Sequence, residues 1–76
     1  MNTNQTELDF TNAAKKTLRY YADIRGGDGF IIYSELATDL IADIKHLCSI
    51  ENIDFDEVLR LSDLHFQFER EIEPNE

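Results

Sequence analysis

An aspartate, a glycine and a glutamate in the first half of the chain match part of a calcium-binding loop. Asp28, Gly29 and Glu35 fit the second half of the pattern D-x-[DN]-x-[DN]-G-x5-E. The first half does not fit, because the first and third loop positions fall on Ile24 and Gly26, which carry no side-chain oxygen. Calcium takes about six to eight oxygen ligands. Since aspartate-glycine before an apolar helix start also forms ordinary turns, we expect no calcium site.

Other residues with chemical potential do not form a complete site. Asp43 and His46 are three residues apart, the spacing of the Glu-x-x-His pairs in di-metal helical bundles, but such a centre also needs carboxylates from neighbouring helices. We expect His65 to be a core histidine hydrogen-bonded to a neighbour, with a perturbed titrating group as the alternative. Cys48, the only cysteine, should be a buried small apolar residue. Without a nucleophile elbow or phosphate loop, we expect no enzyme, no catalytic residue, no metal and no cofactor.

Three amphipathic segments must position these groups. Apolar residues recur at three- and four-residue spacing over residues 9–24, 34–50 and 54–71, which predicts three helices. The first helix should bury Phe10, Ala14, Thr17, Tyr21 and Ile24 and should end at the glycines that follow. A chain of 76 residues supports one core, so we expect a single all-α domain over residues 1–76, a small three-helix bundle. Residues 1–8 should be frayed, and residues 72–76 should form a polar tail.

The start of the third helix carries the clearest boundary signal. Asp54 can cap the helix, and Glu57 follows three residues later as in a capping box. The helix is also more apolar than a bundle position requires. Besides a first ridge, it carries a second ridge of Leu61, Leu64 and Phe68. Either the first two helices clasp this helix from both sides, or the second ridge contacts a partner.

Charge is distributed unevenly along the chain. The net charge is −9, with +1 in residues 1–25 and −10 in residues 26–76. On the second helix, one side carries four polar groups at helical spacing, which are Glu35, Asp39, Asp43 and His46. Such a field repels nucleic acid and favours a basic partner surface, or serves solubility alone. Without an apolar run of about 20 residues or a secretion signal, we expect a cytoplasmic protein with no membrane partner.

Part of the chain resembles a group of small acidic proteins of proteobacterial phages, plasmids and other mobile elements. The resemblance covers roughly residues 36–69 and consists of D-L-x-x-D-x-x-H-x-C, beginning at Asp39, then D-F-D at Asp54 and H-F-x-x-E at His65. It implies a setting in mobile DNA, where short acidic proteins frequently inhibit host defence or transcription machinery. No catalytic residue is carried over with it.

Two functional hypotheses follow. In the first, the protein is an acidic inhibitor or modulator that docks on a basic, nucleic-acid-binding surface of a host protein, as anti-CRISPR and anti-restriction proteins do. The carboxylates of the second helix would then mimic DNA phosphates, because they repeat about every 6 Å along the axis. In the alternative, the protein is a structural or assembly module that forms a homodimer or a stable complex through Leu61, Leu64 and Phe68. Neither hypothesis involves direct nucleic-acid binding.

Overall fold

The computed structural model describes residues 5–27 and 29–71, which form three α-helices. These are α1 (Gln5–Ile24), α2 (Tyr33–Glu51) and α3 (Phe55–Glu71). Since the described residues contain no strand, the predicted all-α, three-helix fold is confirmed. The bounds of α2 and α3 lie within one residue of the predicted ones. The predicted polar tail, residues 72–76, lies outside the described residues.

The first helix begins earlier than its sequence pattern predicted. α1 starts at Gln5, so the expectation that residues 5–8 are frayed is wrong, while residues 1–4 lie outside the described part of the chain. The segment Gln5–Leu8 is polar, but glutamine, glutamate and leucine are good helix formers. No glycine or proline interrupts it. Helix propensity therefore extends α1 beyond the first residue of its apolar periodicity.

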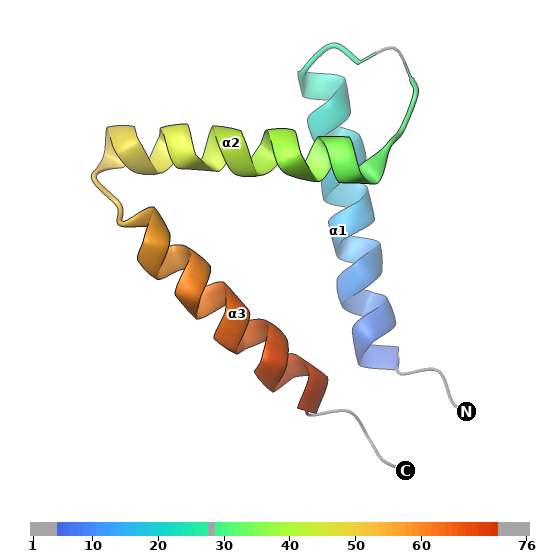
Figure 1. The fold of residues 1–76 in the computed structure, drawn as a ribbon. Coiled ribbons are helices and arrows are strands. Elements are labelled where there is room, and N and C mark those ends of the chain that lie inside the picture. Colours follow the sequence, from blue (N-terminus) through green and yellow to red (C-terminus); the bar gives the residue numbers. More distant parts are fainter. Residues whose placement is uncertain (1–4, 28, 72–76) are drawn as a thin grey trace.

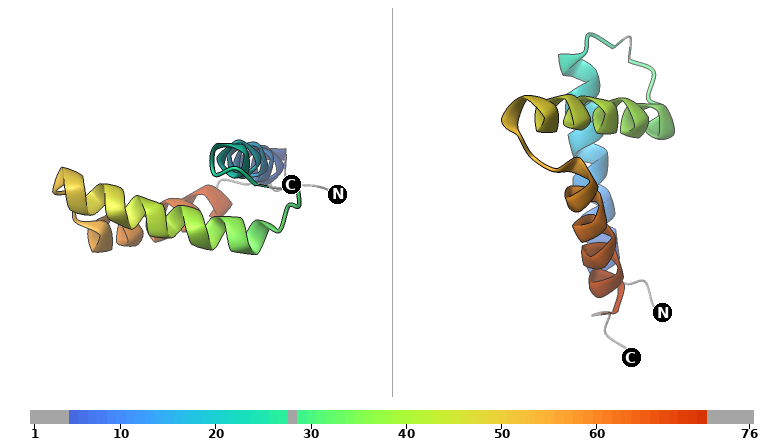
Figure 2. Two further views of the ribbon diagram at one scale, coloured as in Figure 1. Left: turned by 90° about the horizontal axis from the view of Figure 1, so that it is seen from above. Right: turned by 60° about the vertical axis from the view of Figure 1, so that its left-hand side comes forward.

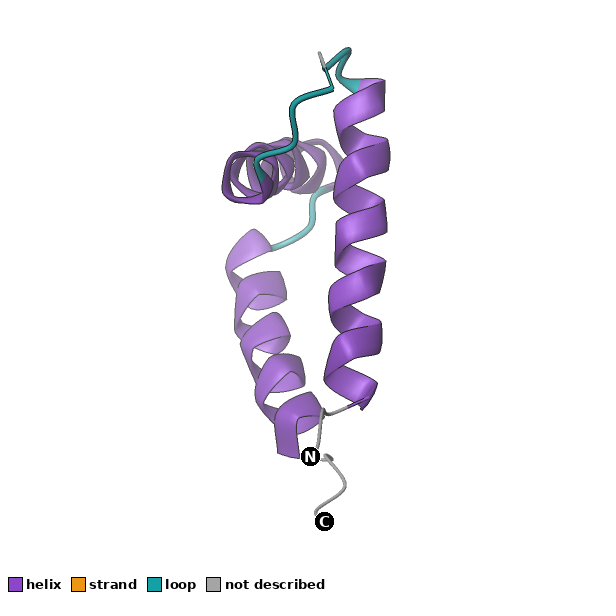
Figure 3. Cartoon of the chain, turned by 90° about the vertical axis from the view of Figure 1, so that its right-hand side faces the viewer, coloured by secondary structure: helices purple, strands orange, loops and turns teal. Residues whose placement is uncertain are grey.

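The three helices are arranged as the sides of an open triangle. α2 crosses α1, and α3 then leaves the far end of α2 and runs back toward the N-terminal end of α1 (Figure 1). Seen from above, α1 lies in a different layer from α2 (Figure 2). α3 runs opposite in direction to α1, and α2 is seen end-on beside the upper half of α1, above α3 (Figure 3). None of the helices within the described residues is long and apolar enough to cross a membrane.

The small core of the molecule lies where α1 and α2 cross. The buried residues there are Tyr21 and Ala22 of α1, whereas Cys48, the third buried residue among those described, lies apart from them in the last turn of α2, next to the turn that leads to α3. The predicted buried face of α1 is therefore mostly wrong, because only Tyr21 of its five residues is buried, whereas Phe10, Ala14, Thr17 and Ile24 are exposed. The reason is the direction from which α2 approaches. It covers the side of α1 that carries Tyr21 and Ala22, and α1 does not bury the whole stripe that its sequence offers.

The first two helices each end in a turn with a residue in the left-handed conformation and a backbone hydrogen bond to the last turn of the helix. After α1, Gly26 adopts a left-handed conformation with φ of 75°, and the Gly27 amide donates to the Ala22 carbonyl at 2.9 Å. After α2, Asn52 is left-handed, with φ of 63° and ψ of 39°, and the Ile53 amide donates to the Cys48 carbonyl at 2.8 Å. These bonds satisfy carbonyl groups that a helix end leaves without a partner.

The predicted cap of α3 forms in part. The Glu57 amide donates to Oδ1 of Asp54 at 3.2 Å, so Asp54 is the N-cap. The reciprocal half of the capping box is replaced by another interaction, because the Glu57 carboxylate accepts two bonds from the Arg60 guanidinium, at 2.6 and 3.0 Å. This ion pair raises the pKa of the Arg60 guanidinium.

Candidate protein-interaction site

The polar row predicted on α2 divides into an exposed part and a part that holds the helices together. Glu35, Asp39 and His46 are exposed. No hydrogen bond or ion pair involves the Glu35 or Asp39 carboxylate among the described residues. Asp43 lies at the edge of the row next to α1, and its side chain is 40% exposed. The four predicted residues therefore do not form one continuous free surface.

Asp43 joins α2 to α1 through a single carboxylate oxygen. Its Oδ2 accepts a hydrogen bond from the Tyr21 hydroxyl and a second from Nη1 of Arg25 at 2.9 Å. The bond from Tyr21, with the attraction of the Arg25 charge, lowers the pKa of the Asp43 carboxyl, although partial burial opposes this shift. The same bond to the carboxylate raises the pKa of the Tyr21 hydroxyl. Both shifts favour a neutral tyrosine beside an ionised aspartate.

Sequence reasoning missed this junction. Tyr21 and Arg25 are four residues apart, so their side chains share one side of α1 around its C-terminal end. That spacing was a signal for a paired site, but it could not identify Asp43 as the acceptor 18 to 22 residues away. This junction stabilises the contact between α1 and α2. Because its carboxylate is already bonded, Asp43 is not a free group for binding a partner.

A second polar contact ties the start of α2 to the basic side of α1. The Nε of Arg19 donates to the Tyr33 hydroxyl at 3.1 Å, and the Nζ of Lys15 lies 5.8 Å from the centre of the Tyr33 ring. Lys16 is exposed beside them, and these basic side chains with Asn12 line a shallow depression. The basic part of the chain therefore partly faces α2 and partly faces solvent.

The second apolar ridge of α3 is exposed along its length. Leu61 is 39% exposed, Leu64 is 48% exposed and Phe68 is 66% exposed. Of the two arrangements that the sequence left open, α1 and α2 therefore do not clasp α3 from both sides. A monomeric domain normally leaves single apolar residues exposed and not a ridge of three on one helix. The surface formed by Leu61, Leu64 and Phe68, here called the outer ridge, is the strongest candidate for a contact with another polypeptide.

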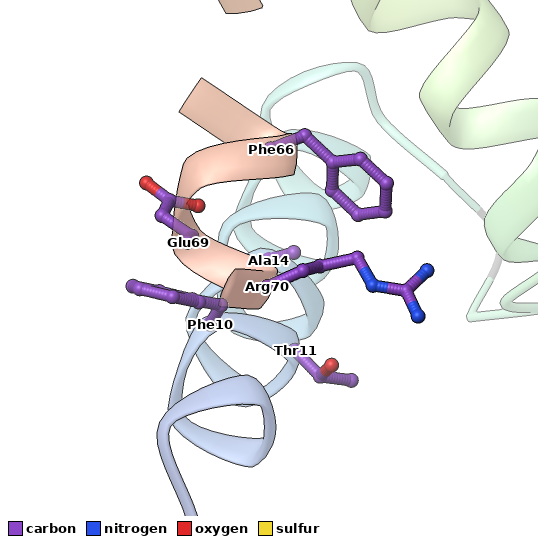
Figure 4. A pocket seen from close by; sticks show the side chains of 6 residues that line it. All are labelled: Phe10, Thr11, Ala14, Phe66, Glu69 and Arg70. Atoms are coloured by element: carbon purple, nitrogen blue, oxygen red, sulfur yellow. The ribbon is translucent and has the colours of Figure 1, made fainter. Parts of the chain in front are cut away.

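The other apolar side of α3 faces α1 without closing against it. A cavity of about 200 Å³ lies between the two helices and is lined by Phe10, Thr11, Ala14, Phe66, Glu69 and Arg70 (Figure 4). Phe66 remains 55% exposed there. Leu64 and Phe66 are two residues apart, so they point about 160° apart around the helix. The outer ridge therefore faces away from α1.

The remaining sequence candidates lie at separate places. Cys48 is buried, as predicted, while His65 is exposed on α3, so the expectation of a core histidine is wrong. The reason is that neither α1 nor α2 covers that side of α3. Asp28 lies outside the described residues, and Glu35 lies in the first turn of α2. In the described part of the chain, no three His, Cys, Asp or Glu side chains are grouped to hold a metal ion.

Comparisons with protein-family models, curated proteins and solved structures found no match to this chain. The surfaces described above are therefore the basis for a proposed function.

Proposed function

We propose that this chain is a non-enzymatic assembly module that forms a stable complex through the outer ridge of α3. The observation that carries this proposal is the exposure of Leu61, Leu64 and Phe68 on one side of a helix whose other apolar side already faces α1. Burying a fully exposed leucine or phenylalanine side chain contributes about 1.5–3 kcal/mol, so covering these partly exposed side chains contributes a fraction of that for each. A partner that covers the three together gains binding free energy without any new polar contact.

The small number of buried apolar side chains supports the same proposal. Among the described residues, no large side chain is fully buried, and sixteen large apolar side chains are exposed. Stable small domains usually gain more from burial than this, or else they associate. A chain with one cysteine cannot form an internal disulfide, so association with another chain is the form of stabilisation open to it.

The test compares Leu64→Glu with Ser62→Glu, which adds the same charge at an exposed position about 160° away from Leu64 around α3. Tagged protein is purified gently from a bacterial extract, and the mass of its native assembly is measured by light scattering. We expect wild type and Ser62→Glu to exceed the mass of one chain and Leu64→Glu to return to it. A Leu64→Glu protein that is helical by circular dichroism and keeps the full assembly would contradict the proposal.

A second candidate function is favoured by a different observation. Glu35 and Asp39 are exposed on successive turns of α2, without a hydrogen bond or ion pair among the described residues. We propose that these carboxylates, with His46 at the border, dock on a basic surface of a host protein that normally binds nucleic acid. The charge of −10 in residues 26–76 and the resemblance to mobile-element proteins support this role as an inhibitor or modulator.

This second role is tested with basic proteins retained on heparin from a bacterial extract. Immobilised wild type should bind a component of that fraction, and added DNA or salt should release it. Glu35→Lys with Asp39→Lys should abolish the binding. The control is Asp56→Lys with Asp63→Lys, which changes the net charge equally on exposed positions of α3. Equal loss in both double variants would show a general charge effect and would sink the specific docking role.

A further inference from the structure

The chain is less compact than a globular domain of the same length. Its radius of gyration is 14.9 Å, whereas a compact domain of this length has a radius of about 11 Å. By the same relation, a compact globule of twice the length has a radius of about 15 Å. One chain is therefore spread over the dimensions that two chains would fill.

The exposed surface leads to the same comparison. The accessible surface is 6250 Å² for a mass of 8.8 kDa, and a compact monomer of that mass exposes about 4,800 Å². The excess is about 1,500 Å². Permanent homodimers bury about 1,000–2,500 Å² on each partner. The surplus surface of one chain therefore has the size of one side of a permanent dimer interface.

We infer that the partner of the outer ridge is a second copy of this chain, packed by two-fold symmetry with the two α3 helices antiparallel. This inference rests on the assembly function proposed above and names its partner. In a two-fold interface the same patch meets itself, so one apolar ridge is sufficient for both copies. Leu64 is the middle residue of the ridge, between Leu61 and Phe68, and it lies at the symmetry axis opposite Leu64 of the other copy.

The charges on α3 permit this pairing in spite of the acidic composition. Asp56 and Asp63 point about 120–160° away from Leu61 and Phe68 and about 80–100° away from Leu64 around the helix, so they lie beside the ridge and not within it. The nearer carboxylate, Glu57, is bonded to Arg60 of the same chain. Two outer ridges can therefore meet without placing their unpaired carboxylates face to face. In contrast, a pairing through the exposed carboxylates of α2 would bring like charges together.

The test uses purified protein alone, at micromolar concentration, with sedimentation equilibrium. We expect wild type and Ser62→Glu to have twice the 8.8 kDa chain mass, and Leu64→Glu to have the mass of one chain. The wild-type melting temperature should rise with protein concentration, since association stabilises the folded chain. This second measurement remains decisive if Leu64→Glu does not fold.

A crosslinking experiment tests the position of the axis. In a Cys48→Ala background, Leu64→Cys should oxidise to a covalent dimer, whereas Ser62→Cys, which points about 160° away from Leu64, should stay monomeric under the same conditions. Equal crosslinking of both cysteines, or a dimer that Leu64→Glu leaves intact, would overturn the inference.

Failure of this inference is distinguishable from failure of the assembly function. If purified wild type is a monomer but its assembly in extract is lost in Leu64→Glu, the second copy is wrong and the assembly function stands. If wild type is a stable monomer both in extract and alone, both proposals fail.

Discussion

The Tyr21 hydroxyl of α1 donates a hydrogen bond to the same Asp43 oxygen of α2 that accepts the bond from Arg25. This relationship lies at the crossing of α1 and α2, where Tyr21 and Ala22 are buried. A polar link and the small apolar core therefore hold the same helix crossing. The position of α2 on α1 depends on both, because few other buried contacts support it.

Tyr21→Phe tests the polar link while keeping most of the ring contact. The variant loses the hydroxyl but can still pack beside Ala22 and under the Arg25 guanidinium, which lies 5.7 Å from the ring centre. We expect a lower melting temperature with unchanged helix content, measured by circular dichroism. Tyr20→Phe is the matched control, because Tyr20 is 69% exposed, and it should leave the melting temperature unchanged. Equal effects of the two substitutions would contradict the link.

The lowered pKa of Asp43 predicts a pH dependence with a definite sign. Its folded pKa lies below the ordinary value of 3.8, so the folded state favours the carboxylate more than the unfolded state does. This contribution to stability is complete above the unfolded pKa and is lost as the pH falls through the folded pKa. The difference in melting temperature between wild type and Asp43→Asn should therefore be largest near neutral pH and should shrink in acid. Asp39→Asn is the control, and a difference that stays constant with pH for Asp43→Asn would refute this assignment.

Charge reversal should separate Asp43 from the rest of its row. Asp39→Lys changes an exposed side chain with no bonded partner among the described residues, so we expect a change in unfolding free energy within about 0.5 kcal/mol. Asp43→Lys instead places a cation beside Arg25 and removes the acceptor of Tyr21. We expect it to lower the melting temperature clearly. Urea unfolding of both variants, at one protein concentration, checks this difference. Similar stability of the two would show that Asp43 does not join the helices.

The parts of the fold that depend on neighbouring residues were predictable from the sequence. Asp54 was expected to cap the third helix, and its carboxylate accepts the bond from the Glu57 amide. Gly26 was expected to stop the first helix, and it adopts the left-handed conformation there. Such signals act over three or four residues, so they do not require knowledge of how the helices pack.

The helix crossing could not be predicted in the same way. The periodicity of α1 identified an apolar stripe that included Ile24, but the approach of α2 buried Ala22 and left Ile24 exposed. Similarly, the polar row of α2 was recognised without its link from Asp43 to Tyr21. Both outcomes depend on contacts between residues far apart in sequence. The exposure of Leu64 could not be predicted for the same reason. Periodicity shows that one side of a helix is apolar, but it does not show whether another helix covers that side.

Calcium should leave the stability of the protein unchanged. The loop positions at Ile24 and Gly26 offer no side-chain oxygen, and Ile24 is the last residue of α1. Saturating calcium at about 100 times its dissociation constant would stabilise a binding protein by about 2.7 kcal/mol. We therefore expect the same melting temperature in millimolar calcium and in chelator. A higher melting temperature in calcium than in chelator, if it disappears in Glu35→Gln, would show that the loop binds the ion.

The turn between α2 and α3 depends on the left-handed backbone of Asn52. Its φ of 63° and ψ of 39° lie in a region that asparagine and glycine adopt more readily than other residues. Asn52→Ala should therefore destabilise the protein by about 1–2 kcal/mol, because a β-carbon without a compensating polar group is strained there. Asn52→Gly keeps the conformation accessible and should change stability far less. Urea unfolding at equal protein concentration measures both variants, and Asn52→Ala should also lose helix content near the turn if Ile53 no longer reaches the Cys48 carbonyl. Equal stabilities of the alanine and glycine variants would mean that the conformation of Asn52 does not determine the turn.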